Sequence, residues 1–165
     1  MTQTQKKNLK SFKASNHSIA FSLSGLSIRR FTLVEPGTDI TGDFDVNKLK
    51  VSFSLDFSHV ISDDKFIIYL GIVYHYPLNK NDILLCELIL LTEFRIVDLK
   101  DVIETKNDRF SLPTGLLQNF VSIAYSTARG ILFTKTQGSF LNQFILPLID
   151  SKTLLEQKIR ETSND

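Results

Sequence analysis

The feature that most constrains this chain is an unbroken alternation of apolar and polar side chains. From Leu49 to Ser58, every odd-numbered residue is apolar and every even-numbered residue is polar or charged. Successive side chains of an extended strand point to opposite faces, so this pattern gives one apolar and one polar face. Antiparallel sheets commonly have one covered and one solvated face. The stretch therefore predicts a half-buried strand of an antiparallel sheet.

Three further segments predict the remaining strands of that sheet. Residues 65–77 and 83–97 alternate in the same way and follow turn-forming sequences. Their core-facing residues are expected to be Phe66, Ile68, Leu70, Ile72, Tyr74 and Tyr76 in the first, and Leu84, Cys86, Leu88, Leu90, Phe94 and Ile96 in the second. The earliest strand, residues 19–33, changes phase twice, which predicts bulges or breaks at Gly25 and near Arg29-Arg30.

After Ser111 the apolar residues recur at helical spacing. Ser111 can cap a helix with Pro113 in its first turn, and Gly130 is expected to end that helix in a left-handed conformation. A shorter helix is predicted for residues 151–160, after Pro147. Strands followed by helices predict an α+β fold with an antiparallel sheet.

The chain is expected to form a single domain over residues 17–160. The polar residues 1–16 and 161–165 predict disordered tails, and residues 35–48, rich in turn formers, predict a long loop that crosses the sheet.

Composition narrows the class of protein. The formal net charge is +1, from 19 basic and 18 acidic residues, so we expect no nucleic-acid partner. Cys86 is the single cysteine, which excludes an intrachain disulfide and favours a reducing compartment. Residues 1–18 lack the apolar region of a secretory signal, and residues 110–128, the longest uncharged run, are too polar to span a membrane. We therefore expect a cytoplasmic protein without membrane insertion.

The sequence offers no candidate for a catalytic or metal-binding residue. His17, His59 and His75 lie far apart, and none pairs with a cysteine or carboxylate at the spacing of metal ligands. Cys86 alternates with leucines, which is typical of a packed core thiol. Phosphate-binding loops and nucleophile motifs are absent from the sequence. We expect no cofactor, no metal and no enzymatic activity.

One unusual feature is the second face of the two central strands. Apolar residues alternate there with the expected core residues, and these are Ile67, Tyr69, Val73, Leu85, Ile89 and Leu91. If this face is exposed, it forms an apolar patch that can bind other chains. The alternative is that both faces are simply buried, by an oligomer or by the crossover loop.

A second unusual feature is the long helix, which carries no charge between Arg109 and Arg129. A solvent-facing helix stripe normally carries lysine and glutamate. The polar stripe here includes Gln118, Ser122 and Ser126, which suits contact with another subunit. The alternative is an ordinary exposed helix in a monomer.

Several short motifs, in the same order over roughly residues 19–155, resemble those of the SecB family. Residues 84–88 (LLCEL) and 93–96 (EFRI) resemble the family's LCEV…G-I-F-x-I strand. Residues 112–130 begin near a proline and end in Ala-Arg-Gly, like the family's helix. Residues 144–150 (FILPLID) resemble its L-x-P-V-(N/D)-F segment, and residues 28–36 are similar to its first strand and F-E-x-P exit.

The resemblance implies a four-stranded antiparallel sheet with two helices on one face, and a tetramer built as a dimer of dimers through the long helices. It implies an ATP-independent chaperone, a holdase, that binds unfolded or nascent polypeptides along apolar grooves. Both unusual features are then expected: client binding at Ile67, Tyr69, Val73, Ile89 and Leu91, and subunit contact at Gln118, Ser122 and Ser126.

Export-type members dock the translocation motor SecA through carboxylates on the sheet. Leu85 and Glu87 match that surface, whereas Arg30 and Val34 stand where carboxylates are expected. Two alternatives to an export role therefore stay open. One is a SecB-like chaperone that guards the antitoxin of a toxin–antitoxin pair, and the other is a binding module for one fixed partner on the same fold.

Overall fold

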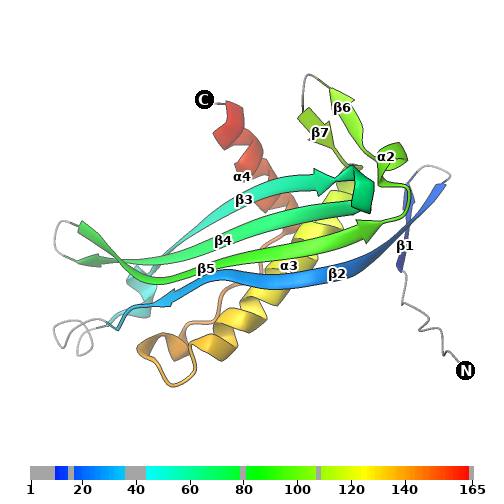
Figure 1. The fold of residues 1–165 in the computed structure, drawn as a ribbon. Helices are drawn as coiled ribbons and strands as arrows, with labels where there is room; N and C mark the ends of the chain where they lie inside the picture. The colour runs from blue at the N-terminus through cyan, green and yellow to red at the C-terminus, as the bar shows by residue number, and fades with distance from the viewer. Residues whose placement is uncertain (1–9, 15–16, 36–43, 79–80, 107–108, 164–165) are drawn as a thin grey trace, which may run out of the picture.

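The main sheet and two helices form an α+β fold in the computed structural model, which describes residues 10–14, 17–35, 44–78, 81–106 and 109–163 (Figure 1). The sheet is antiparallel throughout, with the strand order β1-β2-β5-β4-β3. The strands are β1 (Lys10–Ala14), β2 (His17–Leu33), β3 (Lys50–Val60), β4 (Lys65–Leu78) and β5 (Asn81–Ile96). The predicted fold class is confirmed, and the four predicted strands are β2 to β5.

The short strand β1 corrects the expectation of a tail over residues 1–16. Lys10–Ala14 pairs with the start of β2, so that Lys10 lies opposite Phe21 and Ala14 lies opposite His17. Five residues are too few to show a period in the sequence, and the strand forms because the edge of β2 offers unpaired backbone groups. Residues 1–9 lie outside the described residues.

The two irregularities predicted for β2 are confirmed. Its register against β5 shifts between Leu23 and Gly25 and again between Ile28 and Arg30. Each shift moves the following apolar side chains back to the same face of the sheet. A third shift lies at Tyr74/His75 of β4, opposite Leu85 of β5.

Both helices lie on the same face of the sheet (Figure 1). The long helix α3 spans Thr114–Lys135, and α4 spans Ser151–Ser163. The expectation for Gly130 is wrong, because it lies inside α3, and the glycine with positive φ is Gly138 at 79°. Ser111 is likewise not the cap, since α3 begins after Pro113.

The end of α4 and the short elements also depart from the expectations. α4 begins at Ser151 as predicted but continues through residues 161–163, which were expected in a tail. The sequence reading missed η1 (Val46–Lys48), η2 (Ile61–Asp63), α2 (Leu99–Val102), β6 (Glu104–Lys106), β7 (Arg109–Ser111) and η3 (Phe140–Gln143). Of the predicted crossover loop, residues 36–43 lie outside the described residues.

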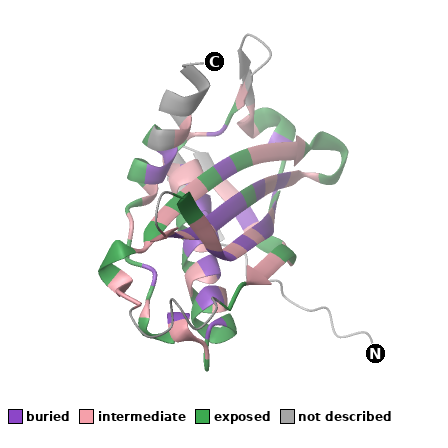
Figure 2. Ribbon diagram, turned by 90° about the vertical axis from the view of Figure 1, so that its left-hand side faces the viewer, coloured by how far each residue is buried: buried purple, intermediate pink, exposed green. Residues whose placement is uncertain are grey.

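The core lies between the sheet and α3, and buried residues line the middle of the central strands (Figure 2). The six predicted core residues of β4 are all buried, and Phe120 of α3 stacks on Phe94 of β5 with ring centroids 4.0 Å apart. Phe120 also meets Phe21 of β2 at 4.9 Å. At the other end of α3, the Lys135 ammonium lies over the Phe31 ring of β2. α3 therefore runs along β2 in the same chain direction.

Candidate functional site

The expected client-binding residues lie on the sheet face opposite the helices, but they are not uniformly exposed. Tyr69 of β4 lies directly opposite Leu91 of β5. Tyr69 is 37% exposed and Leu91 only 2%, so the expectation of an exposed side chain is wrong for Leu91. The other members, Ile67, Val73 and Ile89, are half-buried. We call these five residues the outer patch.

Charged side chains border the outer patch. Arg30 of β2 pairs with Glu87 of β5 at 3.4 Å, and Lys65 of β4 pairs with Glu93 of β5 at 3.4 Å. Gly71 lies between Tyr69 and Val73, where an added Cβ would lie 2.2 Å from the Ser54 hydroxyl of β3. The patch is therefore filled by its own neighbours and flanked by ion pairs.

The two expected motor-docking residues do not share an exposed surface. Leu85 is fully buried, because β5 has its extra residue there and the side chain joins the core. Glu87 is paired with Arg30, the residue that stands where a carboxylate was expected. The expectation of Leu85 as a docking contact is therefore wrong.

The expected interface residues lie on one helix, α3. Ser122 and Ser126 are exposed, and Gln118 is half-buried. The exposed Gly130 and Phe133 continue the same side of the helix, and Phe133 is 43% exposed. This side is uncharged between Gln118 and Ser126, and the role as a subunit contact stays a prediction.

The sequence reading missed an apolar row on β2. Leu23, Leu26 and Ile28 are 51%, 47% and 41% exposed. They pair with Phe94, Thr92 and Leu90, which are buried, so they lie on the helix-covered side of the sheet. The two phase changes in the sequence were the available signal, because each returns an apolar residue of β2 to that side. We call these three residues the β2 row.

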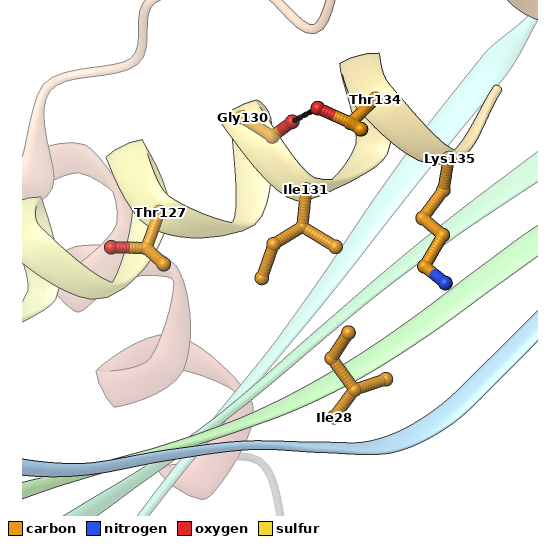
Figure 3. A pocket seen from close by; sticks show the side chains of 6 residues that line it. All are labelled: Ile28, Thr127, Gly130, Ile131, Thr134 and Lys135. Atoms are coloured by element: carbon orange, nitrogen blue, oxygen red, sulfur yellow. Dashed lines mark hydrogen bonds between the residues drawn. The ribbon is translucent and has the colours of Figure 1, made fainter. Parts of the chain in front are cut away.

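A groove lies between the β2 row and the second half of α3 (Figure 3). Its volume is about 460 Å³, and it is lined by Ile28, Thr127, Gly130, Ile131, Thr134 and Lys135. Ile28 and Ile131 point toward one another across it. Gly130 leaves the groove open, because an added Cβ there would meet nothing within 4 Å.

The polar groups of this groove are mostly occupied. The Thr127 hydroxyl donates to the Ile123 carbonyl at 2.8 Å, and the Thr134 hydroxyl donates to the Gly130 carbonyl at 3.0 Å. Both threonines have thus already used their donors within the helix. The remaining polar group is the ammonium of Lys135, which lies 5.8 Å from the centroid of the Phe31 ring. We call this site, with its six lining residues, the β2–α3 groove.

Two hydrogen bonds hold the segment before α4 against α3. Arg129 Nε donates to the Leu146 carbonyl at 2.7 Å, and the Tyr125 hydroxyl donates to the Pro147 carbonyl at 2.7 Å. Leu146 is buried, whereas its neighbours Ile145 and Leu148 are 54% and 81% exposed. Arg129 therefore has a structural role.

The buried titratable groups are unsuited to nucleophilic chemistry. Burial raises the pKa of the Cys86 thiol to about 11, and that of the Tyr125 hydroxyl to about 12. The pKa of Tyr74 is raised for the same reason. A thiol with such a pKa is almost wholly protonated at neutral pH, and the thiolate is the reactive form.

The described residues contain neither a cluster of metal ligands nor a membrane-spanning helix. Within the described part of the chain, no three His, Cys, Asp or Glu side chains gather as metal ligands would. His59 instead packs edge-on against Phe110, with ring centroids 4.3 Å apart. Among the described helices, none has both the length and the apolar character needed to cross a bilayer.

Comparison with known protein families and curated proteins gave no match for this chain.

Proposed function

We propose that this chain is an ATP-independent holdase of the SecB type, which binds unfolded or nascent polypeptides in the cytoplasm as a homo-oligomer. The observation that carries the proposal is the exposed β2 row beside the β2–α3 groove. Three large aliphatic side chains there are about half exposed on the sheet face that also carries the buried core. Contiguous exposed apolar surface of this kind is typical of an interaction site.

The lack of specific polar groups supports a nonspecific client. The groove offers methyl and methylene groups and one ammonium, and both threonine hydroxyls are bonded within the helix. A folded protein hides its apolar segments, whereas an unfolded one exposes many. Selectivity for unfolded chains then requires no sequence motif.

Several copies acting on one client would make this binding effective. Burying apolar surface contributes roughly 25 cal/mol per Å², so a few hundred Å² on one subunit gives weak binding after the entropy cost of association. Linked sites on a tetramer raise the apparent affinity through effective concentration. The uncharged side of α3 with Ser122 and Ser126 is the proposed subunit contact.

The oligomer is tested by light scattering. We expect a mass near four times the 18.8 kDa of the chain. Ser122→Glu together with Ser126→Glu should split the assembly, because it places like charges in a desolvated contact. A monomeric mass for the unchanged protein would contradict the proposed assembly.

The holdase activity is tested by diluting a chemically denatured, unrelated protein into buffer without ATP and following its light scattering. We expect near-complete suppression of aggregation at an equimolar ratio of subunits. Leu23→Ser, Leu26→Ser and Ile28→Ser combined should abolish it. The matched control is Val60→Ser with Ile61→Ser, which changes two similarly exposed residues (38% and 40%) at the β3–β4 turn.

The outer patch is the second candidate surface for clients. Tyr69 is its exposed member, and the triple variant of the β2 row leaves it intact. If that variant folds and still suppresses aggregation, clients bind outside the β2 row.

Among the SecB-like roles, one observation bears on the choice between export and antitoxin guarding. Leu85 is buried and Glu87 is paired with Arg30, so the surface expected to dock SecA lacks an exposed leucine and a free carboxylate. Guarding an antitoxin does not require that surface and is the alternative. A pull-down with purified SecA separates the two roles, because the export role requires a stable complex.

A further inference from the structure

We infer that the β2–α3 groove binds an extended apolar segment of polypeptide that carries a carboxylate at one end, held by Lys135. The inference rests on the proposed function and names the class of client segment that this site selects.

The shape favours an extended chain. The β2 row runs from Leu23 to Ile28, five residues along the strand, and α3 lies beside it in the same direction. Because Ser24 is bulged, Leu23 and Ile28 pair with Phe94 and Leu90, which are four residues apart on β5. At about 3.3 Å per residue the row therefore spans roughly 13 Å, which accommodates about four residues of a second extended segment. Ile28 belongs both to the row and to the groove, so the two form one continuous surface.

The glycine at position 130 of α3 suits an occupant of the groove, because the missing side chain leaves free space on that side of the helix. Glycine is a poor helix former, and this one lies inside α3 with negative φ, where its backbone conformation requires no glycine. Close packing does not require it either, because an added Cβ would meet nothing within 4 Å. The missing side chain keeps the groove open at its middle.

The polar lining selects against a polar occupant. Thr127 and Thr134 have used their hydroxyl donors on carbonyls of α3. A side chain that accepts hydrogen bonds would lose its bonds to water in the middle of the groove without finding a free donor on either threonine, which is unfavourable. The middle of the bound segment is therefore apolar.

Charge complementarity determines the end of the segment. The Lys135 ammonium lies at one end of the groove over the Phe31 ring, and no described carboxylate forms an ion pair with it. Arg29, the bulged residue that follows Ile28 on β2, is a second exposed cation. An acidic side chain or a C-terminal carboxylate would find a partner at Lys135, whereas a basic side chain or an N-terminal amine would be repelled.

The test measures the binding of fluorescein-labelled hexapeptides to the full-length protein by anisotropy. Each peptide has a C-terminal amide, so that its end carries no backbone carboxylate, and five aliphatic residues followed by glutamate, glutamine or lysine. We expect the glutamate peptide to bind at least threefold more tightly than the glutamine peptide, and the lysine peptide to bind most weakly. Lys135→Glu should reverse the order, while the exposed Lys100→Glu of α2 should leave it unchanged. Equal binding of the three peptides would overturn the inference.

Filling the groove provides a test that does not depend on charge. Gly130→Leu should weaken the binding of the glutamate peptide at least tenfold, with helix content unchanged by circular dichroism. If Gly130→Leu does not fold, Gly130→Ala replaces it, with a smaller expected loss of about threefold. If a folded variant binds the glutamate peptide with unchanged affinity, the groove is not the binding site. If Gly130→Leu instead dissociates the oligomer, a second copy of the chain already fills the groove, which would also overturn the site.

Failure of the inference and failure of the proposed function can be distinguished. Aggregation of a denatured protein is measured on the same samples. If the protein suppresses aggregation but binds the three peptides equally, the proposed holdase function stands and the inferred class of client segment is wrong. If the protein prefers the glutamate peptide but does not suppress aggregation, the inferred binding site stands and the proposed holdase function is wrong.

Discussion

The outer patch and the β2 row carry the same kinds of side chain on opposite faces of one sheet, yet they differ in exposure. Leu91 of the outer patch is 2% exposed although none of the described helices covers its face, whereas Leu23 of the β2 row is 51% exposed on the face that the helices cover. The position of each strand explains the difference. β5 lies inside the sheet, so Leu91 has neighbours on both flanking strands.

β2 lies near the edge of the sheet, where β1 pairs only with its first residues. α3 packs over β4 and β5 and leaves the β2 row beside it. Apolar character therefore does not determine burial here. The number of flanking strands and the path of α3 do.

The largest expected difference in stability is between two leucine-to-alanine substitutions, one on each surface. Leu91→Ala should lower the free energy of unfolding by about 2–4 kcal/mol, because it removes a packed side chain and leaves a cavity. Leu23→Ala should change it by less than about 0.5 kcal/mol, because the side chain is half exposed. Urea denaturation measures both. Equal losses would show that the two surfaces are covered alike.

The next effect is a loss of folding stability at alkaline pH. Burial raises the pKa of the Cys86 thiol from 9.0 to about 11, so the folded state holds this proton more tightly than the unfolded state. The resulting stability is fully present below pH 9 and is lost as the pH rises through 11, by up to roughly 2 kcal/mol. Urea denaturation between pH 8 and 11 should show this loss, and Cys86→Ala should reduce it.

The control for this prediction places a thiol on the β2 row. Leu26→Cys in the Cys86→Ala background has an exposed thiol, so its stability should follow that of Cys86→Ala over the same range. Tyr74 and Tyr125 are present in every variant, and the difference between variants therefore reports the thiol. The prediction fails if Cys86→Ala loses stability as steeply as the unchanged protein.

A smaller effect tests how tightly the outer face is filled. Gly71→Ala should lower the free energy of unfolding by about 1 kcal/mol, because its Cβ would lie 2.2 Å from the Ser54 hydroxyl and force that side chain from its rotamer. In the Ser54→Ala background the same change should cost less, since the clashing oxygen is gone. A double-mutant cycle in urea measures the coupling, and zero coupling would contradict the contact.

The smallest effect is a gain at the groove. Gly130→Ala should raise the free energy of unfolding by about 0.5–1 kcal/mol, because alanine is the better helix former and its Cβ meets nothing within 4 Å. Thermal denaturation should show a higher midpoint. A lower midpoint would mean that the groove is closed at Gly130 in solution.

The local pattern of the sequence was sufficient to predict much of the fold. Strict alternation located β3, β4 and β5, and the two changes of phase located both bulges of β2. Helical spacing located α3 and α4. The short elements were missed because three to five residues carry no measurable period, and Gly130 was misread because glycine is tolerated inside a helix as well as at its end.

For the candidate site, the sequence identified which apolar and uncharged residues could form a binding surface, but not which of them are exposed. It indicated apolar residues on the second face of the central strands and an uncharged helix side, and these positions follow from the alternation and the helical period. It did not show that Leu85 is buried, because that depends on the register shift opposite Tyr74/His75. Nor did it show that the β2 row is exposed.

The sequence by itself determined the order and type of the long elements, because the periods of strands and helices are set by local backbone geometry. Only the tertiary structure decided which apolar residues are exposed. The path of α3, set by the packing of Phe120 on Phe94 and Phe21, passes beside β2 and opens the β2–α3 groove. Exposure depends on contacts between residues about a hundred positions apart, such as Phe21 and Phe120, and a local pattern contains no record of them.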